Sequence, residues 1–236
     1  RTVAAEALLR WSSAELGQIS PARFIAVAEE SGLIRQLGGW VLEQACRSAV
    51  AWQSISPCRV AVNVSSIQLQ SPDELLSYVE RALTLSGLPP SLLELEITEG
   101  VLLADRSDIA TLLAHLDQMG VHLSLDDFGT GYSALSYLRR FPFRVLKIDR
   151  SFIAGVPEVP EDAELTRAIV AMGQALGLAV LAEGVERIEQ VAFLAASGCN
   201  LAQGFLYSRP VPTDRFAALL SSGETEHYRS VVAQAS

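Results

Sequence analysis

Short apolar segments alternate with longer helical segments along most of the chain, and this alternation constrains the fold more than any other feature. We expect seven strands, at residues 3–9, 59–64, 92–98, 121–125, 144–148, 179–183 and 201–206. Helical patterns separate them, at residues 21–37, 38–54, 72–86, 105–119, 133–140, 163–176 and 188–196, and a last helix is expected to begin at Thr213. Strands that alternate with helices predict a parallel sheet with crossover helices.

The faces of the strands favour a (β/α)8 TIM-like barrel over an open doubly wound sheet. In residues 93–97 the side chains of Leu93, Leu95 and Ile97 share one face, and those of Glu94 and Glu96 share the other. Residues 60–65 and 121–126 alternate in the same way. Strands of an open doubly wound sheet are covered on both faces and read as nearly continuous apolar runs. A closed barrel needs one strand more than these seven, so we expect the missing strand upstream of residue 1.

Composition limits the class of protein and its partners. The chain has 236 residues, a length that fits one large barrel or two small domains, and the barrel favoured by the strand faces makes residues 1–236 a single domain. Half of the residues are hydrophobic and 19% are charged, so the chain can bury a substantial core. The net charge of −9, without a Lys/Arg run, argues against duplex DNA as a partner. No uncharged apolar run reaches the length of a membrane span, so direct membrane insertion is not expected. Cys46, Cys58 and Cys199 lack metal-type spacing and are expected to be buried, reduced thiols.

Polar side chains gather at the carboxyl ends of the predicted strands, where barrel enzymes carry their active sites. They are Glu6, Asn63, Glu96, Asp126 with Asp127, Lys147, Glu183 and Gln203. Carboxylate and amide oxygens without Cys or His suit a hard cation, Mg²⁺ or Mn²⁺, better than zinc. Carboxylates crowded at one end of the barrel repel one another strongly without cations. We therefore expect one metal ion and consider two.

Each of these residues also has a purely structural interpretation. Glu6 suits the end of a strand, Asn63 a turn amide, and Asp126 with Asp127 an acidic turn before Gly129. Lys147 suits a salt bridge to Asp149 or Glu183, and Gln203 a hydrogen bond to the backbone. Their coincidence at the ends of seven strands favours the metal site.

The chain resembles the EAL domain, the bacterial cyclic di-GMP phosphodiesterase family. The segments that carry the resemblance span residues 6–212 and lie at residues 6–11 (EALLRW), 24–34, 62–65 (VNVS), 94–99 (ELEITE), 126–138 (DDFGTGYSALSYL), 146–152 (LKIDRSF), 182–186 (AEGVE) and 203–210 (QGFLYSRP). The main local departure is Arg187, which follows Glu186 where threonine is usual in the family.

The resemblance implies a modified (β/α)8 barrel whose antiparallel first strand lies upstream of residue 1. It also implies hydrolysis of cyclic di-GMP to linear pGpG at a site with two divalent ions. By the family pattern Glu6, Asn63, Glu96 and Asp126 bind one ion, and Asp126, Asp127 and Glu183 bind the second. Lys147 and Gln203 complete the site around the attacking water, and Leu8 and Arg10 contact the substrate. Glu99 holds the loop after Asp127, and Glu186 lies near the site.

Two alternative functions are a cyclic di-GMP receptor without activity and a kinase-like site. A cyclic di-GMP receptor without activity would have lost metal ligands or the loop after the paired acids, and this chain keeps both. A kinase-like site is suggested by Asp127-Phe128-Gly129 alone and is rejected, because no glycine-rich phosphate loop accompanies it. The resemblance also implies a bacterial cytoplasmic domain, free or in a membrane-anchored protein, with upstream sensor or diguanylate cyclase modules. It further implies a homodimer formed through helices near residues 129–138.

Overall fold

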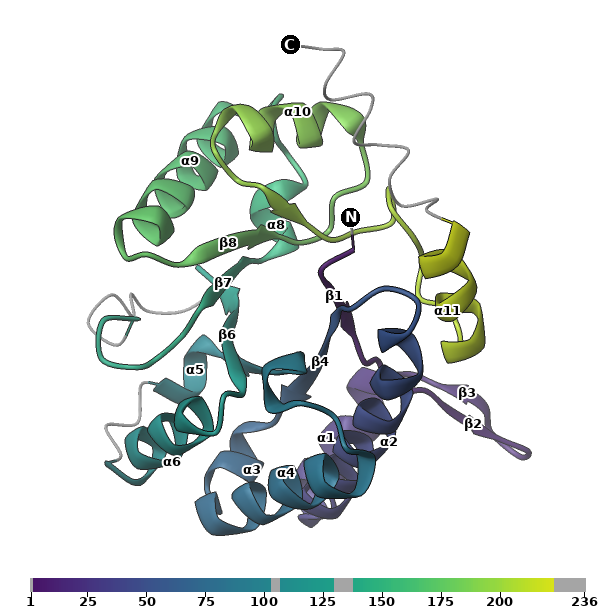
Figure 1. The fold of residues 1–236 in the computed structure, drawn as a ribbon. Helices are drawn as coiled ribbons and strands as arrows, with labels where there is room; N and C mark the ends of the chain where they lie inside the picture. Colours follow the sequence, from purple (N-terminus) through teal and green to yellow (C-terminus); the bar gives the residue numbers. More distant parts are fainter. Residues whose placement is uncertain (1, 103–106, 130–137, 223–236) are drawn as a thin grey trace. The chain divides into compact units, whose positions relative to one another are not determined.

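The computed structural model describes residues 2–102, 107–129 and 138–222, which form two compact units (Figure 1). Of the described residues, the first unit takes 3–97 and 107–122. The second unit takes residue 2 with 98–102, 123–129 and 138–222. We describe each unit by itself.

The first unit is built on three parallel strands, β1 (Ala4–Glu6), β4 (Arg59–Val64) and β5 (Leu93–Thr98). Their register pairs Glu6 with Ala61 and Asn63 with Glu96. Two further strands, β2 (Trp11–Ser13) and β3 (Gly17–Ile19), form an antiparallel hairpin. The helices are α1 (Pro21–Ser31), α2 (Ile34–Gln53), α3 (Ser66–Leu69), α4 (Pro72–Ser86), the 3₁₀ turn η1 (Pro90–Leu92) and α6 (Ser107–Gln118).

Helix α4 shows why these segments are helical. Pro72 opens its first turn, the acidic Asp73 and Glu74 follow near the positive end of the helix dipole, and the left-handed Gly87 ends it. Its apolar face contains the buried side chains of Leu75 and Val79. The helix packs against α2 (Figure 1). The helix therefore has a start, an end and a buried face that are all encoded locally.

The second unit is built on four parallel strands, β6 (His122–Phe128), β7 (Val145–Ile148), β8 (Ala179–Ala182) and β9 (Leu201–Ala202); the first residue of β6 belongs to the first unit. The helices are α5 (Glu99–Leu102), α8 (Arg150–Ile153), α9 (Pro160–Ala175), α10 (Ile188–Ala196) and α11 (Thr213–Ser222). Helix α9 packs on β7 and β8 (Figure 1). Among the described helices, none combines the length and apolar character that a membrane crossing requires.

The structure confirms the alternation of strands and helices, and the segments 59–64, 72–86 and 188–196 have the predicted bounds. The strand predicted at 3–9 is wrong in length, because β1 ends at Glu6 and the chain then turns into the hairpin. The strand predicted at 201–206 is also too long, since β9 ends at Ala202. Residues 133–137 of the helix predicted at 133–140 lie outside the described residues; of the rest, residue 138 is helical and residues 139 and 140 form a turn.

The predicted break between residues 37 and 38 is wrong as well. Helix α1 ends at Ser31 and is capped by Gly32, which has φ 75°, whereas α2 begins at Ile34 and continues through Gly38 and Gly39. Both glycines are buried inside α2, where a Cβ would lie 2.0 Å from Gln68 Nε2 and 2.4 Å from Tyr78 Cδ1, respectively. They are packing sites for neighbouring side chains, and they do not end a helix.

The three cysteines are free and buried, as predicted. Burial raises the pKa of the Cys46 and Cys199 thiols to about 11.

Candidate functional site

An acidic cluster lies at the carboxyl ends of β6 and β8 in the second unit. Asp126, Asp127 and Glu183 each offer a carboxylate oxygen, and these three oxygens lie within 4.8 Å of one another. At an effective dielectric constant of about 20, two carboxylates at that separation repel by about 3 kcal/mol or more. The arrangement therefore calls for positive charge.

Lys147 supplies positive charge from the neighbouring strand β7. Its Nζ lies 3.0 Å from Asp126 Oδ1 and 2.8 Å from Glu183 Oε1, and the residue is 1% exposed. A buried ammonium is tolerated only with such partners. The sequence left open a salt bridge from Lys147 to Glu183 or to Asp149, and the structure shows the first. With every group ionised, three carboxylates and one ammonium leave two negative charges, the charge that one divalent cation neutralises.

An irregularity in β6 brings the two adjacent acids to one cluster. Successive side chains of a regular strand point to opposite faces. Here Leu125 pairs with Leu146 and Phe128 with Ile148, so that two residues of β6 oppose the single Lys147 of β7. Asp127 has φ 53°, the left-handed conformation that aspartate tolerates better than most residues. This bulge lets consecutive carboxylates reach the same place.

The sequence-based boundary at this point is therefore wrong. We predicted a strand at 121–125 that ends in Asp126 and Asp127, with a loop from Phe128 onwards, whereas β6 includes both acids and continues through Phe128. The acids belong to the strand, and the backbone change lies within it.

Glu183 and Gln203 directly follow strands β8 and β9. The Glu183 N–H donates to the Ile148 carbonyl at 3.1 Å, and the Gln203 N–H donates to the Ala182 carbonyl at 2.8 Å. Next to Gln203, a Cβ on Gly204 would lie 2.1 Å from the Val185 carbonyl oxygen, so this close approach requires glycine. Both positions are thus fixed by main-chain bonds to the neighbouring strand.

Glu99 lies at the start of α5 and is 3% exposed. Its Oε2 accepts a hydrogen bond from the Gly129 N–H at 3.3 Å, at the point where the chain leaves β6. The residues that follow, 130–137, lie outside the described residues.

Polar residues of the first unit form a second group. Asn63 Nδ2 donates to Glu6 Oε1 at 2.7 Å, and Glu96 is the register partner of Asn63 on β5, with 3% exposure. Glu94, on the same face of β5, accepts a 2.8 Å hydrogen bond from Arg59 Nε in an ion pair. Glu96, and Glu94 with it, are therefore buried and do not face solvent.

The remaining predicted residues lie at more open positions. Leu8 is 43% exposed, and the exposed Arg10 donates from Nη1 to the Leu9 carbonyl at 2.9 Å. The exposed Glu186 donates its N–H to Gln190 Oε1 at 2.8 Å. The six predicted metal ligands thus divide evenly, with Glu6, Asn63 and Glu96 in the first unit and Asp126, Asp127 and Glu183 in the second.

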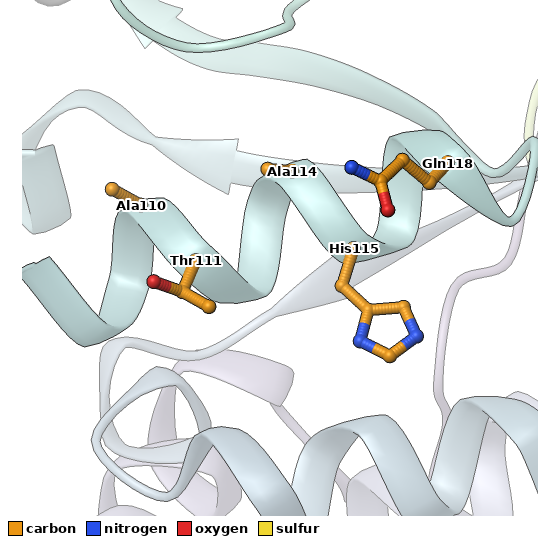
Figure 2. Close-up of a pocket in the computed structure, with 5 residues that line it drawn as sticks. All are labelled: Ala110, Thr111, Ala114, His115 and Gln118. Carbon is orange, nitrogen blue, oxygen red and sulfur yellow. The ribbon is translucent and has the colours of Figure 1, made fainter.

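A hollow of different character runs along α6. Figure 2 shows its lining side chains, all from this one helix: Ala110, Thr111, Ala114, His115 and Gln118. This lining offers no carboxylate, so it does not resemble the acidic cluster.

Sequence reasoning missed one network of the second unit. Arg187 and Gln190, at the start of α10, donate hydrogen bonds to carbonyls of residues 153–156, about thirty positions earlier in the chain. The only local signal was a glutamine three residues after the residue that precedes the helix, the spacing of a capping box.

The comparisons with known proteins agree with this picture. The family described as EAL domain matches residues 1–210. The chain is 47% identical over 209 residues to the cyclic di-GMP phosphodiesterase NbdA of Pseudomonas aeruginosa, covering 88% of this chain and 27% of that protein. It is 44% identical over 218 residues to the bifunctional diguanylate cyclase/cyclic di-GMP phosphodiesterase MucR of the same organism, covering 92% of this chain and 32% of MucR.

A solved structure described as PaMucR phosphodiesterase in complex with c-di-GMP is also similar. The TM-score is 0.86 at 44% identity, and the match covers 91% of this chain and 87% of that one. The similarity confirms the predicted fold class, a (β/α)8-like barrel. The chain spans 27% of the length of NbdA and 32% of the length of MucR, about a third or less of these relatives.

Proposed function

We propose that this chain, which belongs to the EAL domain family, hydrolyses one phosphodiester of cyclic di-GMP to give linear pGpG with the help of divalent metal ions. The observation that carries the proposal is the cluster of Asp126, Asp127 and Glu183 around the buried Lys147. Relatives at more than two fifths identity are named as phosphodiesterases of this nucleotide.

The residues of the cluster fit a hard divalent cation. All three ligands are carboxylates, which Mg²⁺ and Mn²⁺ prefer, and the net charge of −2 on these carboxylates and Lys147 matches one such ion. Bound Mg²⁺ or Mn²⁺ would polarise the phosphate and lower the pKa of a water molecule, so that hydroxide becomes available at neutral pH. We propose that Asp126, Asp127 and Glu183 hold one ion and that Glu6, Asn63, Glu96 and the shared Asp126 hold another.

The other side chains have supporting roles in this proposal. Lys147 and Gln203 orient the attacking water, whose oxygen forms the new bond to phosphorus while an ester oxygen leaves with a proton. Leu8 and Arg10 contact the substrate, the guanidinium of Arg10 pairing with a phosphate oxygen. Glu99 fixes the chain where it leaves β6 through its bond to Gly129, and Glu186 borders the site.

The test is a hydrolysis assay with Mg²⁺ or Mn²⁺, followed by separation of the nucleotides. Metal-dependent appearance of pGpG is the expected result, and chelation by EDTA should abolish it. If cyclic di-GMP binds with micromolar affinity but stays intact under every metal condition, the chain is a receptor and the proposed reaction is wrong.

We also propose that residues 1–236 are one EAL-type domain of a longer bacterial protein, which works in the cytoplasm either free or as part of a membrane-anchored protein. The greater length of the relatives supports this, and MucR joins both activities by name. An upstream sensor or diguanylate cyclase module is the proposed partner domain.

A homodimer formed near residues 129–138 is the proposed assembly, although residues 130–137 lie outside the described part of the chain. Sedimentation velocity across a range of protein concentrations, with turnover measured in parallel, tests it. Turnover that does not change while the dimer dissociates would contradict a regulatory role for this pairing.

A further inference from the structure

Arg187 connects two segments that are far apart in the sequence. From the start of α10 its Nη2 donates to the Val156 carbonyl at 2.7 Å and to the Ala154 carbonyl at 3.3 Å. Its two terminal nitrogens also donate to the carboxylate of Glu158, at 2.7 and 2.8 Å. We call Arg187 and these three partners the Arg187 clamp.

Gln190 makes a second, buried connection between the same two segments. Its Nε2 donates to the Ile153 carbonyl at 2.8 Å, while its Oε1 accepts from the N–H groups of Glu186 and Arg187 at 2.8 and 2.9 Å. Gln190 is 2% exposed, and its side chain thus joins Ile153 to the main chain at Glu186 and Arg187.

One connected segment, residues 153–158, begins at the end of the short helix α8 that follows β7, and the other, residues 184–187, comes directly after Glu183. Lys147 lies in β7, and α8 begins two residues after β7 ends. Glu183 follows β8, and Gly184, with φ 68°, comes so close to Arg150 that a Cβ would lie 2.5 Å from the Arg150 Cβ. The contact between Lys147 and Glu183 and the Arg187 clamp therefore lie at opposite ends of one pair of packed segments.

We propose that Arg187 is a positioning residue that holds Glu183 in register with Lys147 and thereby raises the affinity of the acidic cluster for a divalent ion. This inference rests on the proposed function, because it assumes that Glu183 is a metal ligand. A short side chain at position 187 can cap α10 but cannot reach residues 154–158. Arginine has the length and the planar donor fork to bind two carbonyls and a carboxylate together.

Burial separates the two connections in importance. Gln190 is buried and serves α10 itself, so its removal damages the helix. Arg187 and Glu158 expose 41% and 54% of their side chains, so an exchange at position 187 changes the clamp with little effect on the core. Arg187 is therefore the better position for a test.

The decisive variant is R187T, because threonine keeps a residue able to cap α10 and removes the clamp. The matched control is R167A, which removes another exposed arginine with a 2.7 Å bond to a carboxylate, that of Glu164. Mn²⁺ binding is measured by titration calorimetry, and amide hydrogen exchange is followed at residues 154–158 and 183–187.

We expect R187T to bind Mn²⁺ about three- to ten-fold more weakly than wild type, since loss of a residue that orients a ligand directly costs about 10–100-fold and Arg187 acts one step further out. Hydrogen exchange should rise in both segments. R187K, which keeps the charge but not the fork, should recover part of the affinity, and R167A should match wild type. Turnover at saturating Mn²⁺ should stay within about two-fold of wild type, because positioning changes occupancy.

Wild-type Mn²⁺ affinity in R187T would overturn the inference, and so would an equal loss in R167A. If R187T proves unstable, R187K and E158Q decide: both should bind Mn²⁺ less tightly than wild type and more tightly than D126A. A wild-type protein that binds Mn²⁺ but leaves cyclic di-GMP intact would refute the proposed reaction, and the clamp would still stand or fall by the affinities.

Discussion

The left-handed conformation of Asp127 can be tested by comparing alanine and glycine at that position. At φ 53° the side chain of alanine is unfavourable by about 1–2 kcal/mol, whereas glycine adopts this conformation freely. The larger entropy of glycine in the unfolded chain offsets about 0.4–1 kcal/mol of that difference. D127G should therefore be more stable than D127A by about 0.5–1 kcal/mol.

His122 provides the matched control because it lies in the same strand and has a negative φ. Among the described residues, Asp127 is the only non-glycine residue with positive φ. There the order should reverse, with H122G less stable than H122A by about 0.5–1 kcal/mol. Urea unfolding in the presence of EDTA, followed by circular dichroism, measures all four variants without a contribution from metal.

The same two variants at position 127 should share one defect. Each variant loses a carboxylate of the cluster, so its affinity for Mn²⁺ should fall by a factor greater than about 100. Removal of a residue that only orients a ligand costs about 10–100-fold. If D127A equals or exceeds D127G in stability, the bulge does not have this conformation in solution and our account of how both acids reach the cluster fails.

Three further outcomes are expected. K147M should lower the free energy of unfolding in EDTA by about 3–5 kcal/mol, since it leaves two carboxylates without their buried ammonium, and Mn²⁺ should restore part of the loss; equal stability with and without Mn²⁺ would contradict this. The Cys46 and Cys199 thiols have pKa values of about 11 in the folded chain, against 9.0 for an ordinary thiol. The free energy of unfolding should therefore be unchanged below pH 9 and should fall as the pH rises towards 11. Urea titrations at about pH 8–11 should show a smaller fall for C46A/C199A than for wild type. E6A should lower kcat for cyclic di-GMP by at least ~10²-fold, and near-wild-type turnover would remove Glu6 from the proposed site.

The strands and helices that follow strong local patterns could be predicted from the sequence. Residues 72–86 carry a proline start, acidic first turn, amphipathic face and glycine end, and the structure reproduces these bounds. Residues 59–64 alternate regularly and form β4 as predicted. In both segments the local preference and the packing agree, which makes sequence patterns informative.

Features set by distant contacts could not be predicted. The bulge in β6 depends on two residues of one strand facing one residue of the next, and a single-strand pattern contains no information on that register. The hairpin formed by β2 and β3 has three-residue strands, too short to show a periodicity. Gly38 and Gly39 predict a helix boundary by local pattern alone. Their actual role is to make room for Gln68 and Tyr78, which come from other helices.

The chemical nature of the cluster was predictable, while its internal geometry was not. Carboxylates at strand ends indicated a hard-cation site, and Asp126, Asp127 and Glu183 do come together. Arg187 was noted only as an unusual residue with no role in the chemistry. Its partners lie 29 to 33 positions away, and no helix or strand pattern relates residues at that separation.

The buried ammonium of Lys147 has a consequence for the order of events during biosynthesis. Because the chain brings its own counter-ion to the acids, the polypeptide can complete its folding before any metal arrives, unlike a zinc finger. Scarcity of metal would then stop the proposed hydrolysis without unfolding the chain. A stock of intact, idle molecules would regain activity as soon as the ion returned.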